Sequence, residues 1–293
     1  MPASTGGIAA CPICHGPLAV EARELWCDKG HRFDKAREGF VNLLRPGKSR
    51  KAVIGDDADM VADRRRFLDR GHYQVLSEGI AELVRDLDAE RPVESLLDVG
   101  CGEGTFTAAM LGALADDDSP APTRMAFDIS RPAVKVTARR APEALTCVAS
   151  VIDMPVLDHS VDVLTSIMAP LHEAEFARVI RPGGRIVVVS PGDSHLAQLR
   201  QVLYPHYRPH DEQVALTESL DVVEQRRFTS HVHLGSAQEL HEVWGMTPYR
   251  WNTPLDGQER FAKLTELDVD VHFVATVFRA VSPAHQPRLM SPS

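Results

Sequence analysis

The chain has 293 residues, of which 44% are apolar and 25% charged, and its net charge is −9 at neutral pH. This composition is typical of a soluble globular enzyme and excludes a disordered protein. No apolar run reaches the roughly 18 residues of a membrane span, and the N-terminus lacks the basic start and apolar stretch of a secretory signal. The five cysteines, an odd number, argue against a disulfide framework and for a reducing, cytoplasmic compartment.

Residues 1–44 are predicted to form a small zinc-binding module that recognises RNA. Its candidate ligands follow the spacing Cys11-x2-Cys14-x12-Cys27-x3-His31. Zinc takes four such ligands in tetrahedral geometry, and so short a segment cannot bury enough apolar surface to fold without such a staple. His15 is an alternative fourth ligand, but the spacing of His31 from Cys27 mirrors the first pair more closely. Because four protein ligands would leave no open position, we expect the zinc to be structural.

Basic residues are concentrated near the N-terminus. Residues 1–51 hold nine Lys and Arg against five Asp and Glu, a balance of +4, which leaves −13 for the rest of the chain. Residues 45–55 combine Pro, Gly and four basic residues and are predicted to be a basic linker. A basic head on an acidic body indicates that the head meets a polyanion. An unevenly charged, solvated surface is the alternative explanation.

The remaining chain, residues 56–281, has the pattern of one α/β domain. Two helices are predicted first, over residues 56–70 and 73–87. Strands then alternate with helices, and the predicted strands are 96–99, 124–127, 146–149, 161–167, 185–189, 229–234 and 269–278. This alternation predicts a mostly parallel, seven-stranded sheet with helices on both faces. Residues 282–293 are predicted to be a flexible tail.

The first of these strands runs into a glycine-rich loop with the pattern Asp98-x-Gly100-x-Gly102-Glu103-Gly104. Glycines let the backbone turn sharply and approach a ligand at the carboxyl end of the strand. Glu103 would repel the pyrophosphate of a dinucleotide, whereas an acid there suits a cationic ligand with an amino group, such as S-adenosylmethionine. Asp128 ends the second strand, where a carboxylate can bind two ribose hydroxyls. The sequence therefore predicts a Rossmann-like class I S-adenosylmethionine-dependent methyltransferase fold. Its expected cofactor-binding residues here are Asp98, Gly100, Gly102, Glu103 and Asp128.

Longer motifs resemble those of the bacterial 23S rRNA guanine-N1 methyltransferases, the RlmA family, over almost the whole chain. The matching stretches are the zinc spacing, HRFDKAREGFVNLL, RRRFLDRGHY, LDVGCGEG, AFDISRPAVKVTARR, CVAS, RPGG, SPGDSHL and MTPYRW. The resemblance implies that Gly102 and Glu103 contact the cofactor and that Tyr73 and His195 line its site. From the residues alone, Tyr73 could instead be an aromatic that packs a helix, and His195 a surface residue that starts one.

This family methylates N1 of one of two neighbouring guanines in a hairpin loop of 23S rRNA, and one branch confers resistance to macrolides such as tylosin. The resemblance implies that loop as the partner and allows for a homodimer. Guanine N1 must lose a proton as the methyl group arrives, and Asp153, Asp193 and His195 are the candidate acceptors. Two other functions stay open. A small-molecule methyltransferase of the quinone type would not need the basic zinc head, and a zinc-dependent RNA-binding protein would not methylate.

Overall fold

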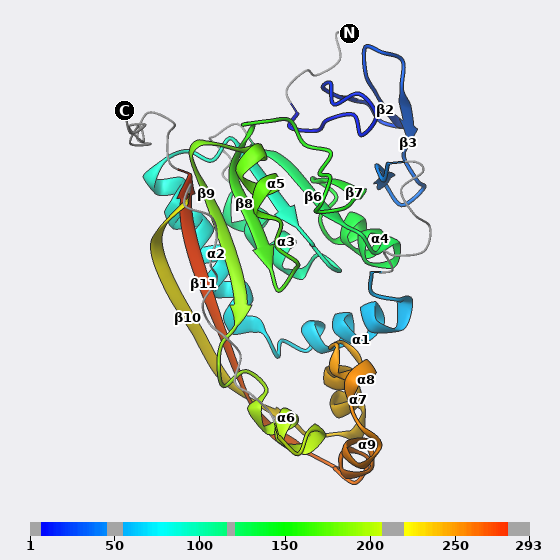
Figure 1. Cartoon of the computed structure of the whole chain (residues 1–293), viewed down its shortest axis with the longest axis vertical. Helices are drawn as coiled ribbons and strands as arrows, with labels where there is room; N and C mark the ends of the chain where they lie inside the picture. The colour runs from blue at the N-terminus through cyan, green and yellow to red at the C-terminus, as the bar shows by residue number, and fades with distance from the viewer. Residues whose placement is uncertain (1–6, 46–54, 116–120, 207–219, 281–293) are drawn as a thin grey trace, which may run out of the picture.

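The computed structural model describes residues 7–45, 55–115, 121–206 and 220–280. Among these residues the main sheet has eight strands (Figure 1). Their spatial order is β10 (Leu220–Leu234), β11 (Leu267–Ala280), β9 (Ile180–Pro191), β8 (Val161–Ile167), β5 (Ser95–Val99), β6 (Thr123–Asp128), β7 (Leu145–Val148) and β4 (Val41–Asn42). The pairs from β9 to β4 are parallel, whereas β11 is antiparallel to both β9 and β10. The predicted Rossmann-like fold with a mostly parallel sheet is confirmed.

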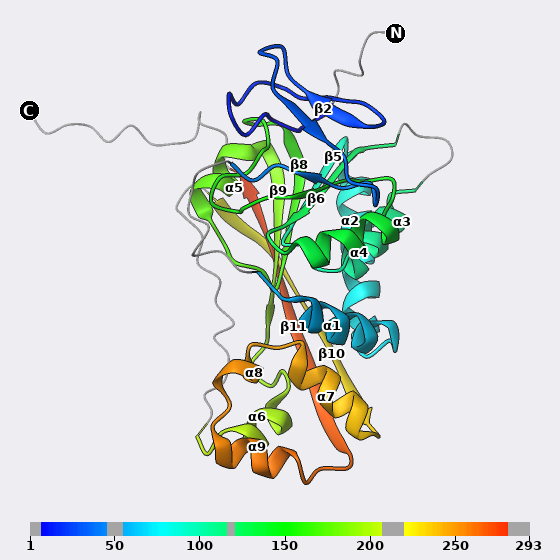
Figure 2. The ribbon, with the colours of Figure 1, turned by 90° about the vertical axis from the view of Figure 1, so that its right-hand side faces the viewer.

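The central strands are buried because both faces of the sheet are covered there. Every residue of β5 and of β8 is buried, as expected for the middle of a parallel sheet. One face is covered by α2 (Gln74–Glu90), α3 (Thr105–Ala113) and α4 (Arg131–Arg140), and the other by α5 (Glu173–Val179) (Figure 2). Two large core clusters result, one on each face of the sheet, and a small third cluster of Phe40, Val134, Ala138 and Val148 lies around α4.

The N-terminal module has a small antiparallel sheet of its own, formed by β1 (Ala19–Val20), β2 (Glu24–Trp26) and β3 (Arg32–Asp34). It is fastened to the loop before β8, because Ala10 N donates to Pro155 O at 2.9 Å and Leu157 N donates to Ile8 O at 2.8 Å. Its apolar residues share one core cluster with the main sheet. The module therefore packs at the end of the sheet where β6 and β7 begin (Figure 1).

β4 is the one strand of the main sheet that the sequence pattern does not predict. Its two residues, Val41 and Asn42, pair in parallel with Cys147 and Val148 of β7. Val41 is buried, and Leu43 N donates to Val148 O at 2.9 Å. The sheet thus has one strand more than the seven expected, and the extra strand comes from the N-terminal module.

A group of helices lies beyond the carboxyl ends of the sheet strands, around the far end of the long β10–β11 hairpin (Figure 2). It consists of α6 (Ala197–Leu203), α7 (Ala237–Gly245), α8 (Tyr249–Asn252) and α9 (Leu255–Phe261). α1 (Ala58–Asp69) is fastened to this group. Glu242 of α7 is fully buried and forms ion pairs with Arg66 of α1 at 3.2 Å and with Arg70, directly after α1, at 3.0 Å. α1 begins at Asp57, whose carboxylate accepts from Met60 N at 2.8 Å.

The predicted flexible tail, residues 282–293, and most of the predicted linker, residues 46–54, lie outside the described residues. In the described part of the chain, no helix combines the length and the apolar character that crossing a membrane requires.

Candidate functional site

The four predicted zinc ligands lie together. The candidate ligand atoms of Cys11, Cys14, Cys27 and His31 are all within 4.8 Å of one another, and His15 is not in this cluster. Cys14 Sγ is 3.6 Å from Cys27 Sγ, and His31 Nδ1 is 3.5 Å from Cys11 Sγ and 3.3 Å from Cys27 Sγ. Around a tetrahedral zinc with bonds of about 2.0 to 2.3 Å, neighbouring ligand atoms are about 3.5 to 3.8 Å apart. The side chains therefore fit a structural zinc ion.

Tight turns bring the two ligands of each pair together. His15 N donates to Cys11 O at 2.8 Å, and Gly30 N donates to Cys27 O, also at 2.8 Å. Gly30 has a φ of 82°, which a residue with a side chain rarely adopts. The short spacing within each ligand pair thus corresponds to a backbone turn around the metal position.

The glycine-rich loop follows the carboxyl end of β5. The zinc module lies at the other end of the sheet, where β6 and β7 begin. Gly100, Gly102 and Gly104 have φ values of 70°, 56° and 87°, so all three occupy the left-handed region that favours glycine. Gly100 N donates to Phe127 O at 2.8 Å, and Thr137 Oγ1 of α4 donates to Gly102 O at 2.7 Å. The loop is therefore held between β6 and the neighbouring helix.

Asp98 lies beneath this loop and is only 2% exposed. Its carboxylate accepts hydrogen bonds from Thr107 Oγ1 of α3 at 2.5 Å and from Thr165 Oγ1 of β8 at 2.8 Å. Burial raises the pKa of Asp98 to about 6, against the opposing effect of the two hydroxyl donors. The structure thus places Asp98 where it ties the helix and a neighbouring strand to the start of the loop.

Asp128 meets the loop from the end of β6. Its Oδ2 accepts from Gly102 N at 3.0 Å and its Oδ1 from Ser130 N at 2.7 Å. Burial raises its pKa, and the two backbone donors oppose that shift. Each carboxylate oxygen has two lone pairs, so each can accept a further bond. Asp128 therefore has the position and the acceptor capacity that ribose hydroxyls need.

Glu103 is buried, and its charge is already matched inside the protein. Its Oε2 accepts from Arg140 Nη1 at 3.1 Å and from both the backbone and the hydroxyl of Thr105 at 3.1 Å. Burial raises its pKa, and Arg140 opposes that shift. The carboxylate that the sequence argument reserves for a cationic ligand is thus shared with an arginine of α4.

Tyr73 and His195 are 122 positions apart and meet in the core, where Tyr73 Oη is 3.1 Å from His195 Nε2. His195 Nδ1 accepts a hydrogen bond from the backbone N–H of His272 at 3.2 Å. In a neutral imidazole the proton is then on Nε2, which donates to the tyrosine oxygen. Burial raises the pKa of Tyr73 above its ordinary value, so its hydroxyl stays protonated and can donate in turn. Tyr73 packs edge-on against Phe273 at 4.8 Å between ring centroids.

Arg64 of α1 is a member of this site that the sequence analysis missed. A Cβ built on Gly102 would lie 3.8 Å from Arg64 Nη1, so the guanidinium faces the glycine-rich loop. Its charge opposes the rise that burial causes in the pKa of Tyr73, Glu103 and Asp128. In the sequence Arg64 stands in a run of three arginines, which gives no sign that one faces inward.

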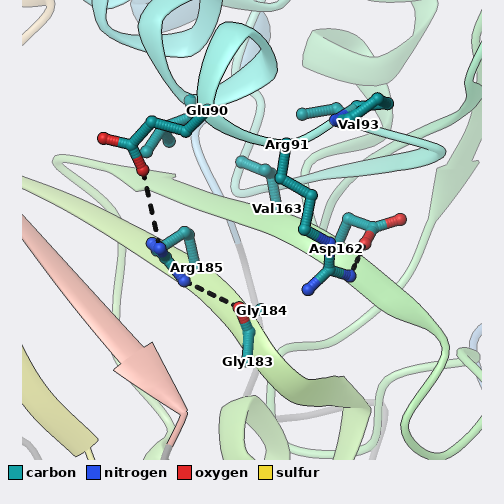
Figure 3. Close-up of a pocket in the computed structure, with 10 residues that line it drawn as sticks. Glu90, Arg91, Val93, Asp162, Val163, Gly183, Gly184 and Arg185 are labelled. Carbon is teal, nitrogen blue, oxygen red and sulfur yellow. Dashed lines mark hydrogen bonds and ion pairs between the residues drawn. The ribbon is translucent and has the colours of Figure 1, made fainter.

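A small cavity elsewhere does not belong to this site. It has a volume of about 30 Å³ and lies at the starts of β8 and β9, away from the glycine-rich loop (Figure 3). Arg91 pairs with Asp162 at 3.1 Å beside it, and Arg185 pairs with Glu90 at 3.6 Å. A space of about one water molecule between ion pairs is a packing feature.

Both the N-terminal module and the α/β domain are similar to known proteins. Residues 9–51 match the family model described as "RlmA, N-terminal", and residues 97–188 match that of a methyltransferase domain. A 23S rRNA (guanine(748)-N(1))-methyltransferase of Streptomyces fradiae is 35% identical, over 88% of this chain and 90% of that protein. Relatives from Micromonospora griseorubida (34% identical, 87% and 91% covered) and Bacillus subtilis (29%, 89% and 93%) are assigned to 23S rRNA guanine-N1 methylation.

Proposed function

Because the chain belongs to the family of 23S rRNA guanine-N1 methyltransferases, we propose that it methylates N1 of a guanine in a hairpin loop of 23S rRNA. The methyl donor is S-adenosylmethionine, and the zinc is structural. The observation that carries the proposal is the similarity to the Streptomyces fradiae enzyme, which spans both the zinc module and the methyltransferase domain. A small-molecule methyltransferase would not need the first, and a purely RNA-binding protein would not need the second.

In this proposal the cofactor binds at the carboxyl ends of the sheet strands, around the glycine-rich loop. The loop backbone at Gly100, Gly102 and Glu103 would contact the cofactor, with Asp98 supporting it from beneath. Asp128 would accept the ribose hydroxyls, which is supported by its place at the end of β6 and its remaining lone pairs. When bound, S-adenosylmethionine supplies a methyl group on a positively charged sulfur, and the protein aligns it.

Tyr73 and His195 would line the same site. The backbone N–H of His272 holds the imidazole of His195 in one tautomer, and that imidazole orients the Tyr73 hydroxyl. This relay leaves the hydroxyl hydrogen of Tyr73 as a donor for the cofactor. Because both imidazole nitrogens are engaged, His195 serves this proposal as a cofactor-site residue and not as the acceptor of the guanine proton.

For that acceptor we choose Asp193, which follows β9 at the same edge of the sheet. Its side chain is 61% exposed, and Oδ1 lies 3.1 Å from His272 Nδ1. Asp153 is less suitable because its carboxylate already faces Arg45 at 3.8 Å. Asp193→Asn should lower the rate of methyl transfer without changing cofactor affinity. An unchanged rate would remove Asp193 from the mechanism.

The arrangement of the chain bears on how RNA is held. The zinc module and the glycine-rich loop lie at opposite ends of the sheet strands. The strand length sets the distance between them, and a seven-residue strand such as β8 is about 23 Å long. An RNA that contacts both must run along the sheet, with the target guanine turned out because N1 lies on the Watson–Crick edge. The proposal also includes a homodimer and a cytoplasmic location.

Mapping the methylated base tests the function directly. Primer extension on 23S rRNA from cells that lack the gene, and from the same cells after complementation, should show a stop at one guanine of the hairpin loop only when the protein is present. The stop also identifies which of the two neighbouring guanines is modified. Identical extension patterns, together with no methyl transfer to purified rRNA, would refute the proposal. Light scattering of the purified protein tests the dimer.

The basic linker is tested separately by its effect on the salt dependence of RNA binding. The variant replaces four residues by Ala, namely Arg45, Lys48, Arg50 and Lys51. Loss of up to four phosphate contacts should reduce the slope of log affinity against log salt by up to about 3. If the linker only keeps the surface solvated, affinity and slope should equal those of the wild type, and that result would overturn its proposed role.

A further inference from the structure

The charges around the glycine-rich loop pose a problem for one part of the cofactor. Asp98, Glu103 and Asp128 all lie at this loop, and burial raises the pKa of each. This acidic surrounding suits the sulfonium and the α-ammonium group of S-adenosylmethionine. The α-carboxylate of the same molecule would be repelled unless a cation stands near it. The described residues bring two arginines, Arg64 and Arg140, to the loop.

Arg140 is already committed to other groups. It donates to Glu103 Oε2 at 3.1 Å and to Asp69 Oδ1 at 2.6 Å, and it contacts the Thr105 hydroxyl. It therefore neutralises the buried Glu103 and joins α1 to α4. Releasing it would leave a buried carboxylate without its partner, which is costly.

Arg64 is placed differently. Nη1 faces Gly102 and pairs with Asp56, and Nη2 donates to the carbonyl oxygen of Met246 at 3.1 Å. Its side chain is 26% exposed and that of Asp56 is 31% exposed, so the pair can rearrange without stranding a buried charge. A guanidinium has five N–H donors in a planar fork. Arg64 therefore keeps donors for a second anion while Asp56 and Met246 hold it in position.

From this placement, and on the basis of the proposed function, we propose that Arg64 binds the α-carboxylate of S-adenosylmethionine. A planar fork that meets a carboxylate with two parallel hydrogen bonds gives both strength and orientation. The contact would place the methionine part of the cofactor across Gly102 and fix the direction of its sulfonium. Arg64 is thus a cofactor-binding residue supplied by α1 and not by the sheet.

The test compares two ligands that differ in the amino-acid part. S-adenosylhomocysteine carries the α-carboxylate, and 5′-methylthioadenosine lacks the whole amino-acid end. Calorimetry on the full chain without RNA should show that Arg64→Met weakens binding of S-adenosylhomocysteine on the order of 10- to 100-fold. Binding of 5′-methylthioadenosine should change less than about twofold, because no carboxylate is lost. The matched control is Arg65→Met on the exposed side of α1, which should leave both affinities unchanged.

Equal losses for the two ligands would show that Arg64 only supports the fold, and an unchanged affinity for S-adenosylhomocysteine would show that it does not touch the carboxylate. Either result overturns the proposal. Arg64→Lys keeps the charge and removes the fork; it should lose affinity for S-adenosylhomocysteine alone, which covers the case in which Arg64→Met does not fold. Because no RNA is present, these results are independent of whether 23S rRNA is the substrate.

Discussion

Replacing Gly104 by Ala should damage the glycine-rich loop in a way that the structure lets us quantify. Gly104 begins α3 with a φ of 87°, and a left-handed conformation costs a residue with a Cβ about 1–2 kcal/mol. The new Cβ would also lie 2.9 Å from Thr137 Cγ2 and 3.0 Å from Thr137 Cα. Overpacking of this kind costs about 1–3 kcal/mol. We therefore expect the free energy of unfolding to fall by about 2–5 kcal/mol.

The cofactor should be affected as well, because Thr137 also holds the carbonyl of Gly102. Gly112→Ala is the matched control, since Gly112 lies in the same helix and a Cβ there meets nothing within 4 Å. That change should raise stability by about 0.5–1 kcal/mol. Urea denaturation and calorimetry with S-adenosylhomocysteine would measure both effects. If Gly104→Ala unfolds within about 0.5 kcal/mol of the wild type, or if Gly112→Ala is equally destabilised, the steric argument is wrong.

Three further predictions concern the metal, the pH dependence and the RNA. Elemental analysis should find about one zinc per chain, and Cys14→Ser should abolish zinc binding and rRNA methylation while S-adenosylhomocysteine still binds; retained zinc would contradict the assignment. Because the pKa of Asp98 is raised to about 6 in the folded state from 3.8, its contribution is greatest at low pH and is lost as pH rises through about 6. Between pH 4 and 6 this lowers the free energy of unfolding by at most about 3 kcal/mol, and Asp98→Asn should remove that decrease. If the free energies of unfolding of the two proteins differ by the same amount at every pH, the linkage is refuted. Trp251 is 63% exposed, and the Arg250 guanidinium lies 4.9 Å from its ring centroid. If RNA bases stack on this ring, Trp251→Ala should weaken RNA binding by about 1–3 kcal/mol, whereas Leu255→Ala, at an even more exposed position, should not. Equal RNA affinities of Trp251→Ala and the wild type in a filter-binding assay would exclude a stacking role.

Features that depend on neighbouring residues could be predicted from the sequence. β8 has the predicted bounds, residues 161–167, because Val, Ile and Thr, which favour strands, are concentrated within these few positions. The zinc cluster follows from two short ligand pairs, each closed by a local turn. The glycine-rich loop follows from glycines at alternate positions, all three of which have positive φ. In each of these cases the residues that impose the local conformation are only a few positions apart in the sequence.

The tertiary structure alone decided which distant residues meet. Glu103 pairs with Arg140, Tyr73 meets His195, and Arg64 reaches Gly102, although each pair is separated by more than 30 positions. No local spacing encodes such contacts, because they depend on which helices cover which edge of the sheet. The same holds for β4, whose two residues form a strand only because β7 offers an edge. It also holds for the zinc module, which backbone hydrogen bonds to the loop before β8 hold at the end of the sheet opposite the cofactor loop.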